Sequence, residues 1–151
     1  MKVIKSKILN IKSGTGCKLI EPCNLYGCVL GENVFIGPFT EIQKNTFIGD
    51  NSKVQSHSFI CEMVTIGKNC FIGHGVMFIN DLFENNGPAQ GDKTLWKETK
   101  IGNNVSIGSN ATILPIEICD NVVIGAGSVV TKNIIEPGVY YGNPARKSNK
   151  K

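Results

Sequence analysis

Four polar side chains could act together in chemistry: His57, Glu62, His74 and Asn80. Imidazole groups exchange protons near neutral pH, a carboxylate accepts hydrogen bonds from an amine or a hydroxyl, and an amide can orient either group. Each of these residues also has an ordinary role, since asparagine is common in turns and histidine and glutamate are common on surfaces. Whether the four converge depends on the elements that carry them.

Those elements come from a repeat of six residues. An aliphatic or aromatic anchor recurs at every sixth position of one stretch, namely Leu30, Ile36, Ile42, Ile48, Val54, Ile60, Ile66, Ile72 and Phe78. Glycine follows five of these anchors, at Gly31, Gly37, Gly49, Gly67 and Gly73. A small or medium residue stands two places before each anchor, as Cys28, Ser52 and Cys70 illustrate.

A period of six is a multiple of the strand period of two and does not match the helical period of 3.6. The repeat therefore predicts short strands separated by corners, with each anchor pointing inward. Three hexads close one triangular coil, and stacked coils pair as parallel sheets around a continuous core. The glycine after an anchor either relieves crowding or permits a positive φ. The predicted fold class is all-β, a solenoid of hexapeptide repeats.

The chain is predicted to be one domain. Residues 1–27 show a shifted, weak repeat and are interpreted as an irregular first coil or cap, and residues 28–79 as regular coils. The polar, glycine-rich segment 80–99 interrupts the repeat and is predicted to be a loop ejected from one corner. Regular coils resume over 100–135, and 136–151 is interpreted as an extended tail. A spacing of five between Ile113 and Ile118 indicates that one corner residue is lost there.

Stacking turns the period into a prediction of neighbours. Residues 18 apart lie one above the other, so Glu62 and Asn80 share a corner, from which the loop leaves. His74 lies at a different corner. The same register places Ser109 and Ala126 on the column of His74.

Composition excludes several classes of protein. The formal net charge is +4, but the last few residues carry four cations and no acid follows Glu136, so the body is neutral and a nucleic-acid groove is not expected. Lysines interrupt the N-terminus before a signal peptide could form, no stretch approaches a membrane span, and a cytoplasmic location is expected. The six cysteines form no CxxC pair and are expected to be reduced, without a metal site.

Several segments carry a family resemblance: QSHSFICEMVTIG (55–67), FIGHGVMFIND (71–81), VSIGSNATILP (105–115), VVIGAGSVVTK (122–132) and YGNPAR (141–146). With them the chain resembles the hexapeptide-repeat acyltransferases, whose fold is a left-handed parallel β-helix. The handedness is implied by the resemblance, because crossovers are ordinarily right-handed. The segments are most similar to the subgroup that N-acetylates nucleotide-linked amino sugars, notably 3-amino sugars of surface polysaccharides. That resemblance implies a homotrimer with acetyl-CoA as co-substrate in a groove between subunits, and no metal.

The resemblance also assigns residues. It implies Asn80, His57 and Glu62 as catalytic candidates, with substrate contacts from Glu62, His74, Asn80 and Asp81. For the cofactor it implies Gly108, Ser109, Ala126, Gly127, Lys132 and Arg146. In a trimer, the His57/His74 corner of one subunit is expected to face the Glu62/Asn80 corner of the next.

Alternatives remain open at the level of the sequence. Relatives that act on UDP-linked amino uronic acids commonly carry an arginine soon after an Asn-Asp pair. This chain has the pair, Asn80 and Asp81, but not the arginine, so a neutral dTDP-linked 3-amino sugar is comparably plausible. O-acetylation of a small hydroxyl compound is another enzymatic reading, favoured if His57 is essential. A non-catalytic trimeric scaffold is a third. Metal-dependent hydratases on this fold need three histidines per site, and the chain has two.

Overall fold

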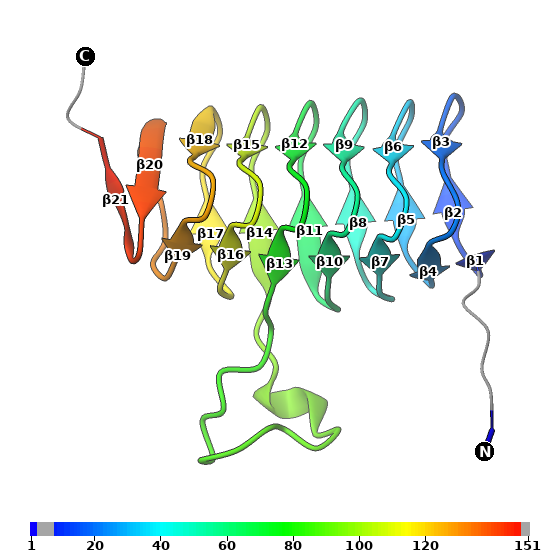
Figure 1. Ribbon diagram of the computed structural model, residues 1–151, viewed down its shortest axis with the longest axis horizontal. Helices are drawn as coiled ribbons and strands as arrows, with labels where there is room; N and C mark the ends of the chain where they lie inside the picture. Colours follow the sequence, from blue (N-terminus) through cyan, green and yellow to red (C-terminus); the bar gives the residue numbers. More distant parts are fainter. Residues whose placement is uncertain (3–7, 149–151) are drawn as a thin grey trace.

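In the computed structural model, which describes residues 1–2 and 8–148, the chain is a parallel β-solenoid. Triangular coils are stacked along the longest axis of the molecule, with β1 at one end and β21 at the other (Figure 1). Twenty of the strands lie in register in three parallel sheets, and β21 adds one antiparallel edge. The predicted all-β solenoid is confirmed.

Each of the first six coils contributes one strand to each sheet, and the last coil meets sheet B only through the bridge between Ile134 and Ile118. Sheet A comprises β1 (Ile8–Leu9), β4 (Asn24–Tyr26), β7 (Glu41–Ile42), β10 (Phe59–Ile60), β13 (Met77–Phe78), β16 (Thr112–Ile113) and β19 (Val129–Val130). Sheet B comprises β2 (Lys12–Ser13), β5 (Val29–Leu30), β8 (Phe47–Ile48), β11 (Val64–Ile66), β14 (Thr99–Ile101) and β17 (Glu117–Ile118). Sheet C comprises β3 (Lys18–Leu19), β6 (Phe35–Ile36), β9 (Lys53–Val54), β12 (Phe71–Ile72), β15 (Ser106–Ile107), β18 (Val122–Ile124), β20 (Gly138–Gly142) and β21 (Ala145–Lys147). Corners are named by the sheets that they join in chain order: A–B, B–C and C–A.

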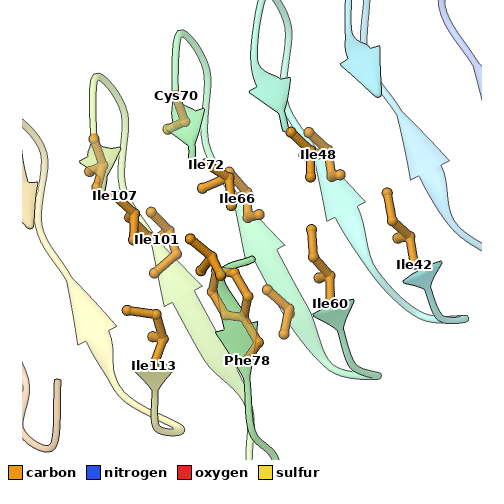
Figure 2. Close-up of a cluster of buried hydrophobic side chains, with 14 of the residues drawn as sticks. Ile42, Ile48, Ile60, Ile66, Cys70, Ile72, Phe78, Ile101, Ile107 and Ile113 are labelled. Carbon is orange, nitrogen blue, oxygen red and sulfur yellow. The ribbon is translucent and has the colours of Figure 1, made fainter. Parts of the chain in front are cut away.

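The anchors form the core. All nine predicted anchors from Leu30 to Phe78 are buried, and after the loop the column continues through Ile101, Ile107 and Ile113. Their side chains point into the solenoid from all three sheets and stack along its axis (Figure 2). No single coil could bury these groups, so the stability of each coil depends on its neighbours.

The glycines that follow the anchors allow close stacking. A Cβ atom on Gly49 would lie 2.6 Å from the carbonyl carbon of Gly67 in the next coil, and one on Gly67 would lie 2.5 Å from Gly102 O. Neither glycine has a positive φ. Of the two explanations predicted for these glycines, relief of crowding is therefore the correct one.

The left-handed conformation falls instead on the residue three places before an anchor. At the first B–C corner this residue is Gly16 (φ 73°), and at the later B–C corners it is asparagine, as Asn51 (φ 58°) and Asn69 (φ 56°) illustrate. Asparagine tolerates this conformation better than most residues. The amide of Asn33 donates to Asn51, and that of Asn69 donates to Asn104, so the corner asparagines link successive coils.

Over residues 8–27 the first coil is regular, which corrects the predicted irregular cap; residues 3–7 of that prediction lie outside the described residues. Described residues 8–27 supply β1 to β4, and β1, β2 and β3 pair with β4, β5 and β6 at an offset of 17 residues in place of 18. The anchor before Leu30 is therefore Leu25, which is fully buried. One corner residue is missing between them, and this deletion produced the apparent shift in the sequence repeat.

Over residues 136–148 the C-terminal segment also differs from the predicted extended tail, whose residues 149–151 lie outside the described part of the chain. β20 adds a parallel strand to β18, and β21 folds back against β20 as an antiparallel hairpin. Tyr140 packs against the core at this end, where its hydroxyl donates to Glu136 O (2.9 Å). The hairpin thereby covers the last coil, as the open end of a solenoid requires.

All six cysteines are free, and four of them are buried. Cys28 and Cys70 occupy the small interior position of their hexads. Burial raises the pKa of Cys28 to about 11 and that of Cys61 to about 12, so both remain protonated and unreactive near neutral pH.

Candidate functional site

The ejected loop leaves the solenoid at one A–B corner. β13 ends at Phe78 and β14 begins at Thr99, so residues 79–98 form the loop, which projects away from the coils (Figure 1). On the two sides of the loop, β13 pairs with β16 at an offset of 35 residues. In the next coil β16 pairs with β19 at an offset of 17. The column of anchors therefore continues past the insertion, and the deletion predicted between Ile113 and Ile118 is confirmed.

Asn80 lies at the base of this loop and is fixed by two hydrogen bonds. Its amide nitrogen donates to Glu62 O (3.2 Å), and its own backbone carbonyl accepts from Lys97 N (2.9 Å). The predicted stacking of Asn80 on Glu62 is thus observed. Because the amide nitrogen faces a carbonyl, the amide oxygen remains available as a hydrogen-bond acceptor.

Glu62 is buried, and its carboxylate is held by the loop. Lys93 Nζ donates to both carboxylate oxygens, at 3.0 and 2.9 Å, while Lys44 Nζ lies 4.0 Å away. The ammonium group of Lys93 also lies 5.1 Å from the centre of the Trp96 ring. Its hydrogen bonds to Glu62 raise the pKa of Lys93. Glu62 is therefore neither a solvated corner residue nor a free acceptor in this structure.

Lys93 belongs to a short turn of the loop that sequence analysis missed. Residues Lys93–Leu95 form the 3-10 helix η1, and the Asp92 carboxylate caps it by accepting from Thr94 N (3.0 Å). Because the loop lies outside the repeat, hexad spacing gives no information about which of its cations reaches Glu62.

The other predicted loop residue, Asp81, organises the loop itself. Its two carboxylate oxygens accept from Phe83 N (2.9 Å) and Ala89 N (2.7 Å). Both oxygens therefore have backbone partners inside the loop. If Asp81 contacts substrate, as the resemblance implies, its carboxylate oxygens must accept from the substrate and from these backbone groups at the same time.

We expect substitution of Lys93 by methionine to loosen the loop. The change keeps an apolar stem beside Trp96 but removes the cation that ties the loop to Glu62. Because the paired state raises the pKa of Lys93, the ion pair is complete below the ordinary lysine pKa and is lost only as the pH rises through the raised value. Hydrogen exchange of backbone amides in 81–98 at neutral pH should accelerate severalfold. Lys97→Met is the control, because Lys97 pairs with Glu84 (3.3 Å) within the loop. Equal acceleration in both variants would mean that the ion pair between Lys93 and Glu62 does not hold the loop.

His57 and His74 lie at C–A corners, the opposite edge of sheet A. His57 adopts a positive φ of 63° at a position where equivalent corners carry Asn110 or Gly127, and its ring stacks on Phe39 with centroids 4.9 Å apart. His74 Nδ1 lies 3.5 Å from Ser109 Oγ in the next coil. Both imidazoles are exposed. Within the chain the two histidines are separated from Glu62 and Asn80 by the width of sheet A.

The residues implied for the cofactor fall in two places. Ser109 and Ala126 continue the column of His74, since Asn110 N donates to His74 O and Gly127 N donates to Ser109 O, both at 2.8 Å. No atom lies within 4 Å of a Cβ placed on Gly127, so the strip is open at that point. A Cβ on Gly108 would lie 2.4 Å from Ala126 N, so Gly108 allows close stacking of the coils. Lys132 and Arg146 line a separate cavity of about 250 Å³ at the C-terminal end.

Sheet A, which joins the two polar corners, carries little charge. Among its described strands the single charged residue is Glu41, whereas the strands of sheets B and C include Lys12, Lys18, Lys53 and Lys100. Its outward row includes Phe59, Met77 and Val129. A charge-poor strip of this kind is typical of a surface that contacts another protein.

Two negative findings concern the described residues. Within residues 1–2 and 8–148, no three His, Cys, Asp or Glu side chains gather as a metal site. No helix of the described chain is long and apolar enough to cross a membrane.

The fold and its corners define a hexapeptide β-helix, and comparison with known proteins gives its family. The model for the bacterial transferase hexapeptide (six repeats) matches residues 27–62, and that for the hexapeptide repeat of succinyl-transferase matches 63–77 and 98–132. Together they cover more than half of the chain. The protein therefore belongs to the hexapeptide-repeat transferase family, with its left-handed parallel β-helix fold.

Individual proteins extend this result. The bifunctional protein GlmU of Acetivibrio thermocellus is 35% identical over 111 residues, which is 73% of this chain and 22% of that protein. The chain spans about a quarter or less of the length of the GlmU proteins that it matches. AntD, an N-acyltransferase from Bacillus cereus in complex with dTDP and coenzyme A, superposes with a TM-score of 0.79 at 20% identity, covering 93% of this chain and 82% of AntD. A maltose O-acetyltransferase from Clostridium difficile 630 superposes with a TM-score of 0.64 at 28% identity, covering 90% of this chain and 70% of that protein.

Proposed function

We propose that the protein is an acetyl-CoA-dependent N-acetyltransferase for a nucleotide-linked amino sugar, and that it acts as a homotrimer. The observation that carries the proposal is the placement of two polar corners at the two edges of one charge-poor sheet. If three copies pack with sheet A toward a common axis, the C–A corner of each copy meets the A–B corner of the next. His57 and His74 then face Glu62 and Asn80 across the seam.

The open strip along the column of His74 suits the cofactor. It runs from His74 over Ser109 to Ala126 without a long side chain, so a pantetheine arm can lie against the backbone. Lys132 and Arg146 supply cations for the phosphates at the C-terminal end, and neither forms an ion pair with a described residue. AntD, which shares the fold, is seen with coenzyme A and with dTDP.

The reaction requires alignment more than proton transfer by the protein. The neutral sugar amine attacks the thioester carbonyl, the N–C bond forms as the C–S bond breaks, and the proton lost by nitrogen goes to the departing thiolate. Asn80 offers its amide oxygen to an N–H of the amine, which directs the nitrogen lone pair at the carbonyl. His57, held against Phe39, is the proposed group at the seam to take a proton if the acceptor is an alcohol.

An acceptor panel tests the proposal. Release of free thiol from acetyl-CoA is measured with dTDP-, UDP- and GDP-linked 3-amino and 4-amino sugars, with maltose as a hydroxyl acceptor and with no acceptor. We expect release with at least one amino sugar and a mass of three chains in solution. Release with maltose alone would favour O-acetylation, for which the likeness to a maltose O-acetyltransferase is the supporting observation. Failure to bind CoA would favour a structural scaffold.

A further inference from the structure

The outer face of sheet C carries a cavity that the proposed site does not use. Its volume is about 560 Å³, which is within the range of small-molecule sites. It lies over the first coils, and its lining includes Lys18, Phe35, Lys53 and Gln55.

Three side chains form the centre of this cavity. Lys18, Phe35 and Lys53 are paired in register on the adjacent strands β3, β6 and β9. Successive side chains of a strand point to opposite faces. The residues that follow these three, Leu19, Ile36 and Val54, are paired in the same register and point inward, so Lys18, Phe35 and Lys53 point outward. Neighbouring strands are about 4.8 Å apart, so the two lysine stems stand roughly 10 Å apart with the aromatic ring between them.

Neither lysine is neutralised by the described chain. Lys68, Lys100 and Lys147, also on the surface, each pair with an acid within 3 Å, whereas Lys18 and Lys53 have no such partner in the part of the chain described. A phenylalanine ring flanked by two free ammonium groups offers a stacking platform and two phosphate contacts. A planar base that carries a diphosphate matches both.

The position of the cavity relative to the seam points the same way. Gln55 lines it and is followed by Ser56 and His57 at the C–A corner, so the cavity opens beside the proposed reaction centre. The proposed strip for the cofactor runs from His74 toward the C-terminal coils. A sugar amine that meets the thioester at His74 must bring the rest of its molecule from the opposite direction, over the N-terminal coils.

We propose that Lys18, Phe35 and Lys53 bind the nucleoside diphosphate of the acceptor, with the base on Phe35 and the phosphates on the two lysines. This inference rests on the proposed function and assigns its specificity site. It makes the N-terminal half of sheet C the acceptor side and the C-terminal half the cofactor side.

Calorimetric titration of the full chain with dTDP, UDP and GDP tests the assignment. In the Lys18→Gln/Lys53→Gln variant, binding of the preferred nucleotide should weaken about tenfold or more, which corresponds to roughly 1.4 kcal/mol. Phe35→Leu should weaken nucleotide binding but leave binding of inorganic pyrophosphate unchanged, because it removes the stacking platform alone. The matched controls are Lys12→Gln and Phe47→Leu, which occupy outward positions on sheet B and should bind as the unaltered protein does. Saturating CoA should not displace the nucleotide.

Four results would overturn this assignment: equal binding by the double variant, equal weakening by the controls, displacement of the nucleotide by CoA, or a change of oligomeric mass in the double variant, which would mean that another copy covers the cavity. The acceptor panel separates these failures from failure of the proposed function. If amino sugars are acetylated and the KM for the nucleotide sugar is unchanged in the double variant, the function stands and the subsite is wrong. If CoA binds and no amino sugar is acetylated, the function is wrong.

Discussion

Substitution of Asn80 by alanine is expected to lower kcat/KM for transfer to the amino sugar about 100-fold, the loss typical of misplaced reacting groups. The structure supplies the reason. The amide nitrogen of Asn80 is engaged by Glu62 O, which fixes the amide oxygen as the group that can accept from the substrate. Alanine removes that acceptor and also unties the base of the loop from the corner below it.

Two further variants separate these effects. Asn80→Asp keeps an acceptor oxygen but cannot donate to Glu62 O and adds a negative charge beside a carboxylate, so we expect an intermediate loss. Asn85→Ala changes an exposed asparagine of the same loop and should leave kcat/KM unaltered. Steady-state kinetics, combined with a check that thermal melting and oligomeric mass are unchanged, measures the difference. Full activity in Asn80→Ala would remove Asn80 from the mechanism.

The solenoid was predictable because its information is local and repeated. The six-residue spacing alone predicts that an anchor such as Ile48 or Ile72 points inward. The same spacing correctly placed Ser109 above His74 across a long insertion. The first coil was misread for a specific physical reason. One residue is missing between Leu25 and Leu30, so a search at strict spacing followed the small interior positions Cys17 and Cys23 in place of the anchors.

The site was less predictable because its contacts come from outside the repeat. Spacing put Asn80 above Glu62 correctly, but it contained no information about Lys93, which reaches Glu62 from a loop with no period. The hairpin that carries Arg146 was missed for the same reason, since its antiparallel pairing follows no hexad. The proposed seam between subunits is a further step removed, because it depends on the surface of sheet A and not on its core.

The second large effect concerns the column on which the site is built. Ile66 is fully buried on β11 and is paired in register with Ile48 on one side and with Ile101 on the other. The pair with Ile101 spans the ejected loop, so it holds together two parts of the solenoid that the chain itself connects only through residues 79–98. Ile66→Ala leaves a cavity where these parts meet, and it is expected to lower the free energy of unfolding by about 2–5 kcal/mol.

Ile66→Val removes one methylene and should cost about 0.5–1.5 kcal/mol. Thr65→Ala, at the exposed neighbouring position on the same strand, should change stability little, within about 0.5 kcal/mol. Urea unfolding, monitored by circular dichroism, measures all three. Because each coil contacts only its neighbours, a defect at Ile66 also weakens the coupling between the two halves, and the transition of Ile66→Ala should broaden or divide into two steps. A single transition with the unaltered midpoint would mean that the column does not join the halves across the loop, and the corner that presents Asn80 would then need another support.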